Sequence, residues 1–339
     1  MAAPIDPSRP IRWGVLGAGR IAATVGAEIA ASGQGELVAV GARDADRAAA
    51  FARTLDIPRS YGSYRELVAD PDLDVLYLAT THGQHHEQAL LALRAGKAVL
   101  VEKAFTLNAR QAAEVVAEAR ARKLFCMEAM WMRLNPMIIR CIEIARSGRI
   151  GDILSVRADL SRPFAYDPEH RLFDLAAGGG ALLDLGVYPI TFVWMLLGAP
   201  ESVQAVGRLS PTGSDVTAAL QLSYPGGQVA QIHSSASAVS PDAGLIIGTE
   251  GWLRLEPRIH RPEALTVWTT DGTETIHGSA EGTGYDLEVA EVERCLRAGL
   301  GESPLVPLDD TVDILRLIDE ARSQLGVRYA ADDERPPRP

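Results

Sequence analysis

The segment that follows the first apolar run of the chain has the residue types of a phosphate-binding turn. Ile11–Leu16 predicts a buried strand, and Gly17, Gly19 and Ala22 follow it in a GxGxxA pattern that opens an Ala-rich helical stretch. The first glycine allows a tight turn, the second lets a pyrophosphate approach the backbone, and helix amides attract that anion. A structural glycine turn in an unrelated α/β protein is the alternative. The cofactor-binding residues expected here are Gly17, Gly19, Arg20 and Ile21.

The end of the second predicted strand indicates which dinucleotide binds. An acidic residue there would hydrogen-bond the ribose of NAD, but this strand ends in Gly41-Ala42 and is followed by Arg43. An arginine suits the 2′-phosphate of NADP, because its guanidinium forms charge-assisted paired hydrogen bonds. We therefore expect NADP, held in part by Ala42 and Arg43. NAD stays possible because Asp44 is so near, and Arg43 could instead be an ordinary surface charge.

A lysine follows the strand predicted at Ala98–Val101, in the pair Glu102-Lys103. The carboxyl ends of parallel strands line the ligand crevice of an open sheet, so this lysine is expected near the reacting atoms. Burial and a positive nicotinamide ring would lower its pKa and help it exchange protons. The alternative is a structural salt bridge within the Glu-Lys pair.

An acid and a phenol follow a run of glycines later in the chain. Gly178–Gly180 opens a predicted helix over residues 181–197, on which Asp184 and Tyr188 stand four residues apart. This spacing predicts that they share a helix face, where they could orient and deprotonate a hydroxyl group. A helix side-chain hydrogen bond with a packed tyrosine is the alternative.

Histidines and cysteines give no metal pattern. His82, His85 and His86 follow the third strand, but they lack further ligands at zinc spacing, so we expect them to line the cofactor pocket or cap a helix and expect no metal. The three cysteines are far apart, which predicts neither a disulfide framework nor a metal site. They are Cys126, Cys141 and Cys295.

Composition limits the classes of partner. The 339 residues favour two domains, and 33 basic against 44 acidic residues give a net charge of −11. An acidic chain is a poor nucleic-acid or anionic-membrane binder. The first ten residues lack the apolar centre of a signal peptide, and the longest apolar stretch, residues 187–199, is too short to span a bilayer. We expect a cytoplasmic protein.

The order of the predicted elements indicates an α/β fold with two domains. Strand and helix patterns alternate up to about residue 131, which predicts a parallel sheet of the Rossmann type. Strand-like runs separated by turns then predict an α+β domain with a large, mostly antiparallel open sheet. The expected boundaries are 10–132 for the NAD(P)-binding Rossmann domain, 133–330 for the substrate-binding and dimerisation domain, and 331–339 for a disordered tail.

Four segments together resemble the glucose-fructose oxidoreductase / inositol dehydrogenase (Gfo/Idh/MocA) family, over nearly the whole chain. The likeness is greatest to the branch that contains dimeric dihydrodiol dehydrogenases and NADP-dependent D-xylose dehydrogenases. The segments are GVLGAGRIA (Gly14–Ala22), ATTHGQHHEQALLALRAGKAVLVEKAF (Ala79–Phe105), EAMWMRLNP (Glu128–Pro136) and RLFDLAAGGGALLDLGVYP (Arg171–Pro189).

The resemblance implies hydride transfer between NADP and a sugar or cyclic polyol hydroxyl, of the aldose or trans-dihydrodiol type, in a homodimer or higher homo-oligomer. It implies Tyr188 as proton acceptor or donor, Lys103 as the residue that lowers its pKa, and Asp184 as the helix acid. It also implies further cofactor contacts from Thr80, Thr81, His82, His85, Glu102, Lys103, Trp131 and Arg133.

The substrate contacts and two alternative functions are further hypotheses from the sequence. Phe164 and His170 are candidate substrate contacts beside Tyr188, and Ala104 stands where the family usually has proline after the lysine. A non-catalytic dinucleotide sensor is one alternative, although the retained lysine, acid and tyrosine disfavour it. An enzyme that holds NAD tightly and oxidises its substrate only transiently is the other.

Overall fold

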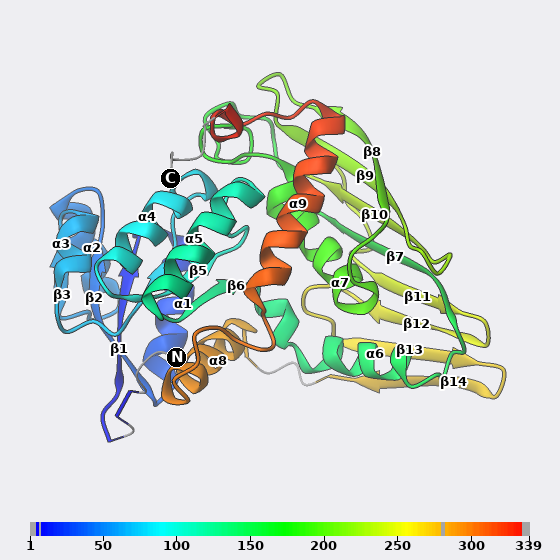
Figure 1. Ribbon diagram of the computed structural model, residues 1–339, viewed down its shortest axis with the longest axis horizontal. Helices are drawn as coiled ribbons and strands as arrows, with labels where there is room; N and C mark the ends of the chain where they lie inside the picture. The colour runs from blue at the N-terminus through cyan, green and yellow to red at the C-terminus, as the bar shows by residue number, and fades with distance from the viewer. Residues whose placement is uncertain (1–4, 7, 279–281, 334–339) are drawn as a thin grey trace. The chain divides into compact units, whose positions relative to one another are not determined.

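Apolar runs from the first 130 residues form a six-stranded parallel sheet in the order β3-β2-β1-β4-β5-β6 (Figure 1). The computed structural model describes residues 5–6, 8–278 and 282–333. Except for the short β3, the strands are mostly apolar segments, as expected when both faces of a parallel sheet are covered. Their bounds are β1 Ile11–Leu16, β2 Gly35–Gly41, β3 Arg59–Tyr61, β4 Val75–Leu78, β5 Ala98–Glu102 and β6 Cys126–Ala129.

Helices cover both faces of this sheet. α1 packs with α8 on one face, while α3 and α4 pack together on the other, as right-handed crossovers require. The helices of this part are α1 Arg20–Ala31, α2 Ala45–Thr54, α3 Tyr64–Ala69, α4 His82–Arg94, α5 Ala109–Arg122 and α8 Tyr285–Arg297. The predicted parallel α/β arrangement is confirmed. The sequence analysis did not predict β3 and α3, because segments of three and six residues are too short to show a clear apolar period.

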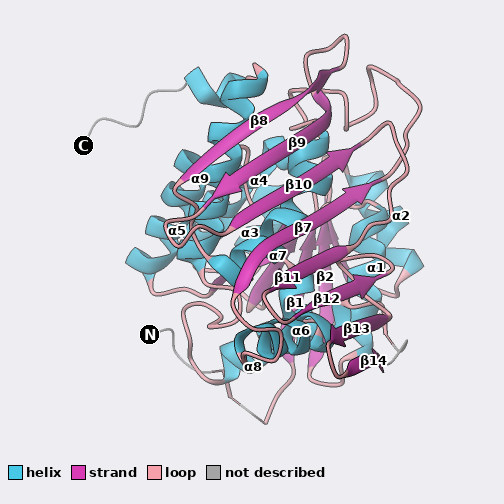
Figure 2. Cartoon of the chain, turned by 90° about the vertical axis from the view of Figure 1, so that its right-hand side faces the viewer, coloured by secondary structure: helices cyan, strands magenta, loops and turns pink. Residues whose placement is uncertain are grey.

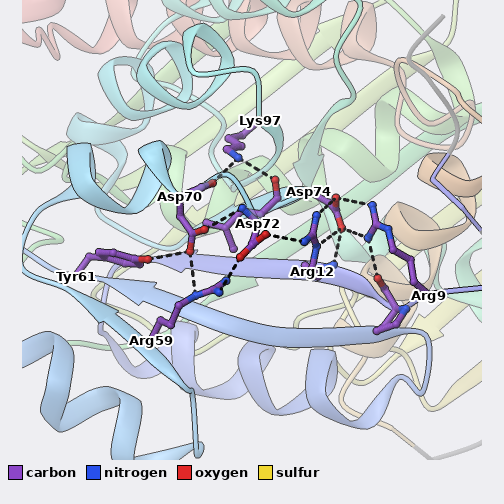
Figure 3. Close-up of polar contacts among 10 residues, drawn as sticks. Arg9, Arg12, Arg59, Tyr61, Asp70, Asp72, Asp74 and Lys97 are labelled. Carbon is purple, nitrogen blue, oxygen red and sulfur yellow. Dashed lines mark hydrogen bonds and ion pairs between the residues drawn. The ribbon is translucent and has the colours of Figure 1, made fainter.

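An ion-pair network joins the amino-terminal ends of the strands (Figure 3). Asp74, which precedes β4, accepts hydrogen bonds from the guanidinium of Arg9 at 2.6 and 2.9 Å and from the Arg12 amide at 2.8 Å. Lys97, just before β5, donates from its buried ammonium to the carbonyl oxygens of Asp70 and Leu73 at 2.6 and 3.0 Å. Ligands of open parallel sheets bind at the opposite, carboxyl ends. This network therefore has a structural role, fixing strand order away from the ligand end.

The second sheet has eight strands in the order β14-β13-β12-β11-β7-β10-β9-β8. Only β7 and β10 pair in parallel; the other neighbours are antiparallel, so the predicted mostly antiparallel sheet is confirmed. The strands are β7 Ile153–Ser161, β8 Ser202–Leu209, β9 Asp215–Ser223, β10 Val229–Ser235, β11 Gly244–Gly248, β12 Gly251–Glu256, β13 Ala264–Thr269 and β14 Gly272–His277.

Helices pack on one face of this sheet, and Figure 2 looks onto the other face. α7 (Val187–Leu197) packs on β7 and β10, and α6 (Pro136–Arg146) packs on β12 and β13. Burial alternates along the strands, because successive side chains point to opposite faces: Val156, Ala158 and Leu160 of β7 are buried under the helices.

Two further findings concern the expected domain limits. The chain divides into two compact units, and residues 282–312, with α8, belong to the unit of the parallel sheet. α8 docks there partly through Glu293, whose carboxylate accepts a hydrogen bond from the Trp13 indole at 3.2 Å. The first part of α9 (Leu308–Leu325) also belongs to this unit, and the rest of that helix belongs to the other. A continuous second domain over 133–330 therefore does not describe the packing.

The first residues of the tail predicted to be disordered, 331–333, have a defined structure. Ala330–Asp333 forms a 3-10 turn, because the Asp332 carboxylate accepts hydrogen bonds from Arg322 at 3.0 Å and from the Tyr329 amide at 2.9 Å. The remainder of that predicted tail, residues 334–339, lies outside the described residues. Within the described part of the chain, no helix is long and apolar enough to cross a membrane.

Candidate active site

The glycine turn after β1 has the geometry that a dinucleotide needs. Gly17 has φ +113°, and a Cβ there would lie 2.9 Å from the Ala79 carbonyl oxygen, so only glycine fits. A Cβ on Gly19, the N-cap of α1, would meet no atom within 4 Å. Ala22 is fully buried, which keeps helix and strand close. Arg20 is exposed and Ile21 half-buried.

The start of α1 also fits an anion. Gly19 gives the helix no side-chain cap, and its first turn carries no acidic residue. The first amides of a helix lack intrahelical partners and carry a partial positive charge, so an uncapped N-terminus suits a phosphate group. The open space at Gly19 lies at this helix end. The residues present here therefore fit a dinucleotide pyrophosphate.

The end of β2 presents cationic side chains. Ala42 is buried and Arg43 is exposed. The Asp44 carboxylate caps α2 by accepting the Arg47 amide at 2.7 Å, and the Arg47 guanidinium donates to the Ala18 carbonyl of the glycine turn at 3.2 Å. Burial raises the pKa of Tyr64, while the nearby charges of Arg43 and Arg47 oppose that rise. The sequence analysis did not predict that Arg47 would reach the glycine turn, since nothing in its spacing sets it apart from other helix arginines.

Two of the three histidines hold the loop after β5. His82 donates from Nε2 to the Lys103 carbonyl at 3.1 Å, and Nδ1 of His85 lies 3.0 Å from the Ala104 carbonyl oxygen. His85 Nε2 also lies 3.2 Å from the carbonyl oxygen of Thr80, and burial lowers the pKa of His85 to about 4. His86 instead pairs with Glu114 at 2.9 Å. The described residues include no group of three or more metal-binding side chains.

The buried side chains of Tyr77 on β4 and Glu102 on β5 are joined by a hydrogen bond. Glu102 accepts a hydrogen bond from the Tyr77 hydroxyl at 2.5 Å and from the Lys103 amide at 3.2 Å. The peptide bond between Lys103 and Ala104 is cis. Thr80 donates to the Gln88 side chain at 2.6 Å, and Thr81 is the N-cap of α4. The Glu102 carboxylate is thus held by Tyr77 and by the Lys103 backbone, and Lys103 itself is partly exposed.

Trp131 and Arg133 lie in a 3-10 turn, Trp131–Leu134, after β6, rather than at the end of a strand. Both are buried. The Trp131 ring packs against Tyr285 with centroids 5.0 Å apart, and a Cβ on Gly284 would lie 2.8 Å from that ring. β6 therefore ends at Ala129, two residues before Trp131, and the start of α8 covers the indole.

Asp184 and Tyr188 occupy different kinds of helix. Asp184 lies in a π-helical turn, Leu182–Gly186, and Tyr188 lies in α7, so the single α-helix expected over 181–197 is interrupted. Asp184 accepts two hydrogen bonds from Arg171 at 3.1 Å each. Tyr188 packs its ring against His260, with centroids 5.2 Å apart. Because a π-turn changes the residue period, four-residue spacing does not by itself place both on one α-helical face. Arg171 and His260 were missed as contacts because they are distant in sequence.

A buried carboxylate holds the glycine run that precedes them. Asp215 of β9 accepts the Leu182 amide at 2.6 Å, and a Cβ on Gly180 would lie 2.3 Å from Asp215 Oδ1. The Tyr329 hydroxyl donates to the Gly179 carbonyl at 2.9 Å. Burial raises the pKa of Asp215 to about 6. These contacts fix where the helix with Asp184 and Tyr188 begins, which explains why glycines are needed there.

The two candidate substrate residues lie together. Phe164 is 37% exposed, and its ring lies 5.6 Å from that of His170. His170 in turn lies 6.1 Å from the Phe173 ring, which is buried. The segment that carries them is therefore anchored by a buried aromatic residue while it presents exposed aromatic surface.

Comparison with known proteins agrees with this geometry. The model of the oxidoreductase family with an NAD-binding Rossmann fold matches residues 11–130, and that of the GFO/IDH/MocA C-terminal domain matches residues 138–254. The chain belongs to the GFO/IDH/MocA family. It is an NAD(P)-dependent oxidoreductase, as the resemblance of its motifs predicted.

Named relatives cover almost the whole chain. It is 39% identical over 335 residues to trans-1,2-dihydrobenzene-1,2-diol dehydrogenase of Mus musculus and 36% identical over 332 residues to that of Homo sapiens; both alignments cover 95% of this chain and 99% of the relative. A 3-ketoreductase from Actinomadura kijaniata, solved with NADP and TDP-benzene, has a TM-score of 0.84 at 27% identity, covering 94% of this chain and 98% of that one.

Two glycine variants distinguish an effect on cofactor binding from an effect on the stability of the fold. We expect Gly19→Val to weaken NAD(P)H binding by about tenfold or more with an unchanged melting temperature, because its Cβ enters open space that a pyrophosphate would fill. Gly17→Ala should lower the melting temperature instead, since it meets the Ala79 carbonyl at positive φ. Fluorescence titration and thermal unfolding measure both. Wild-type affinity in Gly19→Val would contradict the assignment.

His85 should make stability depend on pH. Its pKa is lowered from about 6.5 in the unfolded chain to about 4 in the fold, so the unfolded chain binds the proton more readily and stability falls as the pH decreases between those values. His85→Asn retains an amide donor but does not titrate. We expect the wild-type advantage in unfolding free energy over this variant to shrink by about 3 kcal/mol between pH 7 and 4. Urea denaturation measures it, and a constant difference would contradict the prediction.

Proposed function

We propose that this protein is an NADP-dependent dehydrogenase that transfers hydride reversibly at a hydroxyl-bearing carbon of a sugar or cyclic diol. The full-length similarity to trans-1,2-dihydrobenzene-1,2-diol dehydrogenases, at up to 39% identity, carries this proposal. The presence of Lys103, Asp184 and Tyr188 supports it, because an acid–base residue and its neighbours are what hydride transfer from an alcohol requires of the protein.

The preference for NADP rests on the charges after β2. The Asp44 carboxylate is committed to capping α2, whereas Arg43 is exposed and Arg47 reaches the glycine turn. A 2′-phosphate is bound well by guanidinium groups, and a ribose hydroxyl is bound well by a carboxylate. The available charge at this position therefore favours NADP over NAD.

An arginine variant tests this choice of cofactor. We expect the wild type to bind NADPH more tightly than NADH, and Arg43→Ala to lose about tenfold to a hundredfold in NADPH affinity because it loses charge-assisted hydrogen bonds. Its NADH affinity should change little. Fluorescence titration measures all four values, with Arg53→Ala, an exposed arginine of α2, as the control. A wild-type preference for NADH would reject the NADP assignment.

In the proposed reaction, the bound dinucleotide supplies the hydride acceptor, and the protein handles the proton. Tyr188 accepts the proton of the substrate hydroxyl as the carbon loses hydride, and it returns the proton in the reverse direction. The family resemblance assigns Lys103 the role of lowering the pKa of this tyrosine, and that assignment is part of the proposal. Asp184 holds the Arg171 guanidinium in place through two paired hydrogen bonds.

A conservative tyrosine variant tests the chemical step. We expect Tyr188→Phe to reduce turnover of sugars or cyclic diols by about 10²–10⁴-fold, because the ring remains and the proton acceptor is lost. NADPH affinity should stay near the wild-type value, since the glycine turn is untouched. Absorbance of reduced nicotinamide reports turnover across a sugar and diol panel. Full activity of this variant would reject the assigned role.

The same panel separates the alternatives. Binding of NADPH without turnover of any substrate would favour a dinucleotide sensor. A cofactor that remains bound through purification, with substrate conversion but no net reduction, would favour transient oxidation by tightly held NAD. Exchange of cofactor with net reduction supports the proposed dehydrogenase.

We further propose that the helix-free face of the second sheet forms a homodimer contact. Val206 of β8 is 71% exposed there, and Trp268 of β13 is 39% exposed, stacked on Trp252 with ring centroids 6.2 Å apart. Exposed apolar side chains on a broad sheet face are typical of subunit contacts. Because these side chains lie on strands far apart in the sheet, they support an extended contact.

Sedimentation velocity measures whether the protein is a monomer or a dimer and so tests this contact. We expect the wild type to be a dimer and Trp268→Glu to shift toward monomer at micromolar concentration, because a charge would be buried in the contact. Ala50→Glu, on the exposed surface of α2, is the matched control and should stay dimeric. A monomeric wild type would contradict the proposal.

A further inference from the structure

The proposed reaction leaves Tyr188 with a proton that must reach solvent in every oxidative turnover. The tyrosine is only 7% exposed, and the helix that carries it, α7, packs on β7 and β10 of the second sheet. A buried phenol exchanges protons slowly unless a titratable group or a bridging water lies beside it. The surroundings of Tyr188 should therefore contain a group able to pass the proton on.

His260 is a titratable group in contact with this tyrosine. The two rings lie 5.2 Å apart between centroids and are tilted by 39°, so they are in van der Waals contact. His260 is half-buried, so the residue contacts the tyrosine and is also partly accessible to solvent. An imidazole titrates closer to neutral pH than other side chains, which suits it to proton exchange.

The turn that carries His260 is fixed in place. The preceding residue, Ile259, is fully buried, and its amide donates to the Asp242 carbonyl at 2.6 Å. The Arg261 amide donates to the Arg258 carbonyl at 2.7 Å, and Arg258 forms an ion pair with Glu263 across the same turn. These contacts hold the imidazole against α7 instead of leaving it on a loose loop.

We propose that His260 relays the proton of Tyr188 to solvent, an inference that rests on the proposed function of the tyrosine. In oxidation, the Tyr188 phenolate takes the hydroxyl proton of the substrate while hydride leaves the same carbon. Neutral His260 then accepts that proton from the phenol, directly or through one water, which restores the phenolate. The imidazolium releases the proton to bulk water. Reduction uses the same steps in reverse, so protons and electrons balance in both directions.

Chemical rescue distinguishes a relay from simple packing. We expect His260→Ala to lower kcat by about tenfold to a hundredfold, with NADPH affinity unchanged, and added imidazole to restore most of the lost rate. His260→Phe keeps an aromatic ring against Tyr188 but transfers no proton, so it should be equally slow and not rescued. His277→Ala, an exposed histidine of β14, is the control and should keep the wild-type rate. Circular dichroism and thermal unfolding verify that each variant is folded.

Two results would overturn the relay. One is wild-type kcat in His260→Ala or His260→Phe, which would show that proton exchange does not need the imidazole. The other is a slow His260→Ala variant that imidazole does not restore, which would assign the residue to packing. Tyr188→Phe, measured in parallel, separates the two proposals: if it is inactive while His260→Ala is fully active, only the relay fails. If Tyr188→Phe is fully active, the proton-acceptor role of Tyr188 fails and the relay fails with it, although the dehydrogenase activity itself stands.

Discussion

The unit of the parallel sheet depends on satisfying the loop backbone at the carboxyl ends of its strands without filling the space there. Buried carbonyl groups need hydrogen-bond donors. At the edge of the sheet where a ligand binds, the loops must leave room for that ligand, so they cannot pack tightly enough to satisfy one another. His82 and His85 answer this constraint from α4, because their rings reach the carbonyl groups of Lys103 and Ala104. Gly17 meets the same constraint by letting β1 turn against Ala79. The uncapped start of α1 thereby stays open to an anion.

The antiparallel unit meets a comparable constraint with a carboxylate. The start of the helix that carries Asp184 and Tyr188 is buried, so its amides need acceptors. Asp215 supplies one from β9, and Tyr329 binds the Gly179 carbonyl from the segment after α9. Side chains on Gly179 or Gly180 would collide with backbone or carboxylate oxygens. The glycine run is thus explained by close approach of protein groups as much as by room for a ligand.

Charge is arranged to serve each end of the parallel sheet differently. At the amino-terminal ends, Asp74 is paired with Arg9 and Arg12, and Lys97 is bound by carbonyl groups. At the carboxyl ends, Asp44 is used as a helix cap and Arg43 is left exposed. Local cations therefore face the region where a phosphate is expected, although the chain carries a net charge of −11. Net charge describes the whole surface, whereas recognition depends on a few local groups.

The parallel sheet, the glycine turn and the antiparallel second sheet could be predicted from the sequence, because apolar periodicity and glycine spacing are local properties of the chain. The sequence also contained the motifs that place the chain in its family. Tertiary structure alone decided that His82 and His85 hold carbonyl groups, that Asp184 binds Arg171, and that His260 contacts Tyr188. It also decided that α8 joins the parallel sheet and that Asp332 orders the start of the tail. These contacts join residues far apart along the chain or on different elements, and short-range pattern carries no information about them.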